Sequence, residues 1–171
     1  MAQEHLSLRV KWRRFRMRPA EDRHLILLAA FILALTKVGL SWFGFQRWKE
    51  LIEKVLLPAD RPLPLPAGSQ FEKGLRVARA VHSAELHGIG LPNCLERSLT
   101  LWLLLRLKGI AGELHIGARK VSGRLDAHAW VELDGRVLND GAEVYERYAL
   151  FDAPIAAGSA QPRTAGRTAF E

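Results

Sequence analysis

The chain has 171 residues, 49% of them hydrophobic, and carries a formal net charge of +7. This length suffices to bury one hydrophobic core but excludes two large domains, so we expect one compact domain with appended segments. A single cysteine excludes an internal disulfide framework and a cysteine-based zinc site, which predicts a cytoplasmic protein.

The chain begins with a basic segment. Residues 9–18, "RVKWRRFRMR", contain six cations in ten positions, with Trp12 and Phe15 between them. Such a pattern suits nucleic acid, an anionic membrane surface or an acidic protein, and it also suits a solvated arm. Composition alone leaves these alternatives open. We assign residues 1–57 to a basic arm and an N-terminal helical segment.

The next segment, residues 24–45, is strongly apolar. Its uninterrupted run "LILLAAFILAL" is about half of the roughly 20 residues that a spanning helix needs. A secretory signal is disfavoured because the preceding flank is long and no small-x-small cleavage site follows. We therefore expect residues 24–57 to pack as helices against the core or a partner, and we do not favour membrane association.

Four prolines in residues 58–68 forbid a helix interior and predict an extended linker. Residues 70–88 follow with apolar side chains at helical spacing, which predicts an amphipathic helix. We assign residues 69–150 to the main domain, which contains every candidate functional group. Residues 151–171, rich in Ala, Gly, Pro and Thr, are predicted to form a flexible tail.

The only cysteine opens a predicted helix in "LPNCLERSLTLWLLLRLKG". Asn93 is a good N-cap and Glu96 stands where a capping box needs it, so the helix should begin at Cys94 and end before Gly109. The unpaired N–H groups and the positive end of the helix dipole favour the thiolate of Cys94, which is the nucleophilic form. The competing interpretation is packing, because free cysteine often behaves as a small buried hydrophobe.

Strands are predicted at residues 113–121 and from residue 127, where "AHAWVEL" alternates in polarity and places His128 on one face. Asp134 and Gly135 indicate a hairpin turn. A two-residue loop would place Asp140 on the opposite face from His128, whereas a three-residue loop from Leu133 to Gly135, with a G1 bulge, would pair His128 with Asp140. We predict the three-residue loop and a Cys94, His128 and Asp140 triad, with Asp140 orienting the imidazole.

Three other residues compete with Asp140 for the orienting role. Glu132 faces the same side as His128 and is the stronger rival, Asp126 lies awkwardly on the same strand, and Asn139 faces away in the chosen register. We expect no metal and no cofactor, because three further histidines have no accompanying cluster of ligands in the sequence: His82, His87 and His115.

Three segments together resemble the B2 proteins of lasso-peptide biosynthesis, which are leader peptidases with a transglutaminase-like cysteine-protease fold. They are "NCLERSLTLWLLLRLKG", "LHIGAR" and "DAHAWVELDGRVLND", and the likeness covers roughly residues 70–142. The resemblance implies an α+β fold in which a catalytic helix packs on a small antiparallel sheet, with added N-terminal helices. It also implies the catalytic roles of Cys94, His128 and Asp140.

The activity that this resemblance implies is removal of the leader from a ribosomally made precursor, which frees the amine that a separate lasso cyclase then joins to a side chain. The expected partners are the precursor leader peptide, the cyclase and a separate B1 leader-recognition protein of winged-helix type, since no such module precedes residue 70. We expect no nucleic-acid partner. The backbone N–H of Cys94 is the first oxyanion donor, and the second is unassigned. The alternatives are acyl transfer to an amine, and a non-catalytic scaffold that binds the precursor and partner proteins.

Overall fold

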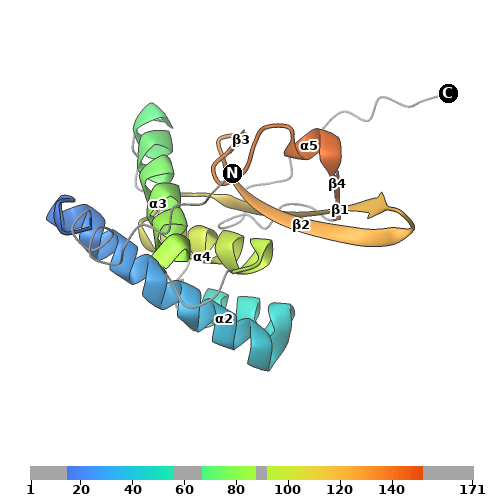
Figure 1. Ribbon diagram of the computed structural model, residues 1–171, viewed down its shortest axis with the longest axis horizontal. Helices are drawn as coiled ribbons and strands as arrows, with labels where there is room; N and C mark the ends of the chain where they lie inside the picture. Colours follow the sequence, from blue (N-terminus) through green and yellow to red (C-terminus); the bar gives the residue numbers. More distant parts are fainter. Residues whose placement is uncertain (1–14, 56–66, 88–91, 152–171) are drawn as a thin grey trace, which may run out of the picture.

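The computed structural model describes residues 15–55, 67–87 and 92–151. Of the helices that lie within these ranges, three precede the sheet: α2 (Ala20–Val55), α3 (Ala67–His87) and α4 (Cys94–Leu107). They are followed by β1 (Glu113–Val121), β2 (Arg124–Leu133), β3 (Arg136–Val137), the short α5 (Val144–Arg147) and β4 (Ala149–Leu150). Figure 1 shows the three helices gathered beside one end of the sheet, while the β1–β2 hairpin projects beyond them. The predicted α+β class is confirmed.

Several predicted segments fall largely outside the described residues. The basic run 9–18 is described only from Phe15, which packs against the hydrophobic core. The predicted linker 58–68 is described only at its last two residues, where α3 begins, and the predicted tail 151–171 only at Phe151. The division of the chain into these parts therefore stays a prediction.

Helix α2 is sharply bent at Gly44, whose φ of 70° and ψ of 173° are not helical. The bend lets Trp48 pack over Gly39, where an added Cβ would overlap the indole ring. Phe43 stacks on the same ring at a centroid distance of 6.4 Å. By length and composition, residues Ala20–Ile52 would suffice to cross a membrane, a property that core helices of soluble proteins share.

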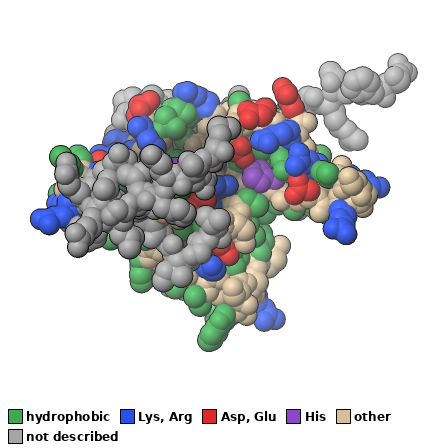
Figure 2. Space-filling model, in the orientation of Figure 1, with side chains coloured by type: hydrophobic (Ala, Val, Ile, Leu, Met, Phe, Trp, Pro, Cys, Tyr) green, Lys and Arg blue, Asp and Glu red, His purple; other side chains and the backbone are tan. Residues whose placement is uncertain are grey.

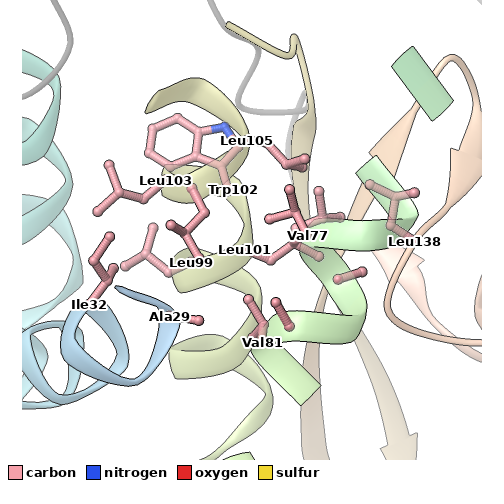
Figure 3. Close-up of a cluster of buried hydrophobic side chains, with 14 of the residues drawn as sticks. Ala29, Ile32, Val77, Val81, Leu99, Leu101, Trp102, Leu103, Leu105 and Leu138 are labelled. Carbon is pink, nitrogen blue, oxygen red and sulfur yellow. The ribbon is translucent and has the colours of Figure 1, made fainter. Parts of the chain in front are cut away.

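Helix α4 is the centre of the hydrophobic core. Every residue from Ser98 to Leu105 is buried. Figure 3 shows Leu99 and Leu103 directed toward α2, where Ile32 lies, and Leu101 directed toward Val77 of α3. The core joins side chains from both sides of the predicted linker, including these from α2 and α3: Ala29, Ile32, Ile52, Val77 and Val81. An all-round apolar helix is thus covered on nearly every side.

The sheet is antiparallel, with strand order β3-β2-β1-β4. Strands β1 and β2 pair along their full lengths, from Glu113 opposite Glu132 to Val121 opposite Arg124. The connecting residues Ser122 and Gly123 both have positive φ, of 49° and 81°. The bounds predicted for the first strand, 113–121, match β1.

The predicted three-residue loop at the second hairpin is wrong. Leu133 pairs with Arg136, so the loop has only two residues, Asp134 and Gly135, with φ of 52° and 72°. Two positive φ values are typical of a type I′ turn, whose twist matches the twist of the flanking strands, and Asp-Gly is a preferred sequence for it. The positive φ predicted for Gly135 is confirmed, but no bulge is needed to form the turn.

The ladder between β2 and β3 ends soon after this turn. The Leu138 N–H donates to the Val131 carbonyl at 2.9 Å, but the Val131 N–H donates to the side-chain oxygen of Asn139 at 2.8 Å. A side chain thus takes the place of the next backbone acceptor, and the chain bends away from β2. The part of β2 that precedes Val131 is therefore not paired with β3, and its hydrogen-bonding edge on that side is open to another element.

Candidate active site

The first turn of α4 forms as the sequence predicts. The Asn93 side-chain oxygen accepts the Glu96 N–H at 2.8 Å, and the Glu96 carboxylate accepts the Asn93 N–H at 3.1 Å, which completes the capping box. At the other end of the helix, Gly109 has a φ of 70° and occupies the C′ position. Cys94 is therefore the first helical residue, in a turn whose N–H groups have no acceptor within the helix.

The start of α4 covers the open edge of β2. The Ser98 hydroxyl donates to the Ala129 carbonyl at 2.8 Å, and the Cys94 thiol points to the Ala127 carbonyl at 4.0 Å. The spacings match, because four helical residues rise about 6 Å and two strand residues rise about 6.8 Å. Two side chains one helical turn apart thus follow two carbonyls of the strand, and the thiol lies at the carbonyl of Ala127, the residue that precedes His128.

His128 and Asp140 are brought together, as the sequence predicts. The Nε2 atom of His128 hydrogen-bonds to Oδ2 of Asp140, and both side chains are about four-fifths buried, with 17% and 21% exposed. The route differs from the predicted one, because the two residues are not partners in a hairpin ladder. Asp140 reaches the ring through the bend that follows β3, so the two-residue turn does not separate them.

Asp140 has further partners that favour its ionised form. Its Oδ1 atom accepts the Gly141 N–H at 2.7 Å and faces the Arg147 guanidinium at 3.4 Å. Burial raises the pKa of this carboxyl, but the hydrogen bonds from His128 and Gly141 and the charge of Arg147 outweigh burial and lower it. An ionised Asp140 is suited to hold the Nε2 proton of His128, which leaves Nδ1 as the nitrogen that can accept a proton.

Asn139 lies inside the site, although the predicted register turned it away. Its amide nitrogen donates to the Ser98 hydroxyl at 2.8 Å, while its oxygen accepts the Val131 N–H. Asn139 therefore joins α4 to β2 immediately before Asp140. The sequence reasoning considered Asn139 only as a rival of Asp140, and it missed Ser98. The only available signal was the placement of Ser98 one helical turn after Cys94.

Aromatic rings surround the imidazole of His128. Tyr148 stacks on it at a centroid distance of 4.9 Å, and Trp130 lies at 6.3 Å on the same strand. The fully buried Trp130 donates its indole N–H to Glu132 at 2.6 Å. Two flat rings therefore limit the orientations of the imidazole.

The rivals of Asp140 have other partners. Glu132 accepts the Trp130 N–H and lies 3.4 Å from His115, so the His128 ring is not its partner. Asp126 accepts from Arg119 at 2.8 Å and from the Tyr148 hydroxyl at 3.2 Å. The Arg119 hydrogen bond lowers the pKa of Asp126. Asp126 thereby anchors Tyr148 beside His128 without contacting that ring itself.

The other histidines whose side chains the structure describes do not assemble a metal site. His115 is buried between Glu113 and Glu132, and His82 is exposed beside Glu85. Within residues 15–55, 67–87 and 92–151, no group of three or more His, Cys, Asp and Glu side chains is arranged to hold a metal ion. The side chain of His87 lies outside the described residues. The pairing of the Cys94 thiol with the imidazole of His128, which the predicted triad needs, stays a prediction.

Comparison with known proteins identifies one family. A family model described as the transglutaminase-like superfamily matches residues 27–151, which include most of α2 and every element of the site. No curated protein and no solved structure matches the chain. The matched region begins well before residue 69, where the sequence placed the start of the catalytic domain.

Proposed function

Because the chain belongs to the transglutaminase-like superfamily, whose members are often cysteine peptidases, we propose that it is a cysteine peptidase that removes the leader from a lasso-peptide precursor. The observation that carries the proposal is the His128–Asp140 hydrogen bond, in a structure that also has a thiol at the start of α4 pointing to the Ala127 carbonyl. The finer assignment to lasso precursors depends on the sequence likeness of the segments that contain Cys94, His128 and Asp140.

In the proposed reaction, Nδ1 of His128 takes the Cys94 proton and the thiolate attacks the carbonyl carbon at the junction of leader and core. The backbone N–H of Cys94 donates to the developing oxyanion. The C–N bond then breaks and His128 protonates the leaving amine, so the core peptide departs and the leader remains as a thioester. Water, deprotonated by His128, hydrolyses the thioester to a free leader acid and restores the thiol.

Asp140 is proposed to orient the imidazole and to stabilise its charged form during these steps. Ser98 and Asn139 are proposed as positioning residues, because they fix the start of α4 against β2 and hold the bend that carries Asp140. The proposed partners are the precursor, a B1 leader-recognition protein and the lasso cyclase. The cyclase would join the freed core amine to an Asp or Glu side chain of the core.

The decisive experiment is cleavage of the cognate precursor by the purified protein and its B1 partner. Cys94→Ala should abolish cleavage while the circular dichroism spectrum and the unfolding midpoint stay close to those of the parent. Retained cleavage by this variant would overturn the proposal. Mass spectrometry of the products also tests transfer to an amine, because hydrolysis yields free leader acid and transfer yields a conjugate.

A matched pair of variants tests the role of Asp140. Asp140→Ala should lower the cleavage rate by about 10²-fold or more, because the imidazole loses its orienting acceptor. Glu132→Gln is the control, since it alters a nearby buried carboxylate that does not contact His128 yet keeps an acceptor for Trp130. Equal losses in the two variants would contradict the assignment of Asp140.

One observation favours a second function, a non-catalytic scaffold that binds the precursor and its partners. The acceptor of the Cys94 thiol is the Ala127 carbonyl, not the imidazole. The rate of alkylation by iodoacetamide at neutral pH distinguishes the two functions. A peptidase thiol should react faster than a model cysteine, whereas a rate no faster than that of the model would favour the scaffold.

A further inference from the structure

A cavity of about 280 Å³ lies between α3, α4 and the segment that follows β3. Helix α3 contributes most of its wall, α4 contributes Arg97 and Leu101, and the segment after β3 contributes Leu138 and Asn139. A cavity of roughly 150 Å³ can bind benzene, so this one has room for a large aliphatic or aromatic side chain. Its size therefore fits one side chain of a peptide.

The cavity adjoins the site at two points. Arg97 lies three residues after Cys94 on α4, and residues at that spacing have Cβ atoms about 5–6 Å apart on one helix face. Asn139 precedes Asp140 and is fixed by its hydrogen bonds to Ser98 and Val131. A peptide whose carbonyl lies at the Cys94 thiol would thus have a neighbouring side chain within reach of the cavity.

The chemistry of the wall selects an apolar occupant. Five of the nine lining residues are aliphatic, and they come from all three segments: Leu75, Ala78, Val81, Leu101 and Leu138. Each basic side chain of the lining has a partner, although the buried Nε atom of Arg97 has none among the described residues. Arg97 pairs with Glu85 at 3.3 Å, His82 lies 3.5 Å from the same carboxylate, and Arg79 donates to the Leu75 carbonyl at 3.3 Å. Pockets of this composition bind mainly by apolar contact.

We propose that this cavity is the specificity subsite for one large apolar side chain close to the bond that the enzyme cleaves. The inference rests on the proposed peptidase function, because it places that bond at Cys94. Ala78 and Leu75 set the size of the subsite: a larger residue at 78 narrows it, and a smaller residue at 75 widens it. The proposal thus names two residues whose substitution should shift side-chain preference in opposite directions.

The test uses three alkylating agents that reach Cys94 without a precursor: iodoacetamide and its N-isobutyl and N-benzyl derivatives. Rates of modification are measured by intact-protein mass spectrometry, and each is divided by the rate of the same agent with free cysteine. The normalised rate of the parent protein should be about tenfold higher with an apolar derivative than with iodoacetamide. This factor corresponds to only part of the free energy that is gained by burying such an apolar group.

Two variants make the test specific to the cavity. Ala78→Leu should remove the advantage of both derivatives, and Leu75→Ala should raise the N-benzyl rate relative to the N-isobutyl rate. The iodoacetamide rate should stay unchanged in both variants, which verifies that the fold and the thiol are intact. If a variant unfolds, the preference of the parent protein and the response of the other variant still decide the question.

The outcomes separate this inference from the proposed function. Equal normalised rates for all three agents, or an apolar preference that survives Ala78→Leu, would overturn the subsite and leave the peptidase proposal intact. A Cys94→Ala variant that still cleaves the precursor would instead overturn the peptidase. An apolar preference in the parent that disappears in Ala78→Leu supports the subsite.

Discussion

Helices α2 and α4 are both strongly apolar in sequence, yet the structure surrounds them very differently. In α4, Leu101 and Trp102 are fully buried, whereas on α2 Phe31 is 66% exposed and Trp42 is 80% exposed. In Figure 2, hydrophobic side chains reach the surface along the lower part of the molecule, where α2 lies in Figure 1. An all-round apolar sequence predicts burial on many sides, but the number of neighbouring elements decides how many sides are covered.

The placement of α4 also explains why the site is at its N-terminus. The helix is fixed along its length by the core, and its first turn meets the open edge of β2 through Ser98 and Cys94. Helix α2 covers one side of α4. The partners of Cys94 and Ser98 are in β2 and not in α2. The core therefore holds the thiol in register with the Ala127 carbonyl, one residue before His128.

The two helices should differ most in the loss of unfolding free energy when one large side chain is truncated to alanine. Leu103→Ala in α4 should lower the free energy of unfolding by about 2–5 kcal/mol, because it opens a cavity in the core. Phe31→Ala on the exposed side of α2 should change it by about 0.5 kcal/mol or less. Urea denaturation followed by circular dichroism measures both, and similar losses in the two variants would contradict the difference in burial.

Loss of the hydrogen bonds by which Asn139 links α4 to β2 should cause the next largest fall in the free energy of unfolding. Asn139→Ala should cost about 1–3 kcal/mol, because the Val131 N–H and the Ser98 hydroxyl each lose a partner. Cleavage should fall as well, since the bend that carries Asp140 is released. A double-mutant cycle with Ser98→Ala should show coupling of about 0.5–3 kcal/mol, and strict additivity would show that the two side chains act independently.

Acid should weaken the site at the start of α4 before it affects the rest of that helix. The folded-state pKa of Asp140 lies below its ordinary value of 3.8, so its stabilising contribution is complete above that value and is lost as pH falls through the folded pKa. Asp140→Asn should therefore flatten the dependence of stability on pH in this acidic range. An unchanged slope would indicate that the ionised carboxylate does not stabilise the folded state.

The smallest effect is expected on the exposed side of α2. Replacing Phe31 and Val38 together by Gln should leave the free energy of unfolding within about 1 kcal/mol of the parent value, because both side chains are largely exposed. We also expect the parent protein to be recovered from cells without detergent. A requirement for detergent when the proposed partners are absent would revive α2 as a membrane span.

Local sequence signals predicted a substantial part of the fold and of the site. Asn93, Glu96 and Gly109 marked the two ends of α4, and alternation of polarity placed His128 on a strand. These features succeed because capping and strand alternation depend on neighbouring residues. The predicted loop length was wrong. Asp134 and Gly135 form a two-residue type I′ turn, whereas we predicted three residues because that register would pair Asp140 with His128.

The sequence by itself determined where the thiol lies on its helix, and it supplied a histidine and an aspartate near in the chain. Only the tertiary structure decided how His128 and Asp140 meet. Asn139 replaces a backbone acceptor for Val131 and reaches Ser98, 41 residues away, so that the chain turns and carries Asp140 to the ring. Hydrogen bonds between residues so far apart leave no periodic pattern in the sequence, because their partners are chosen by the packing of α4 against β2.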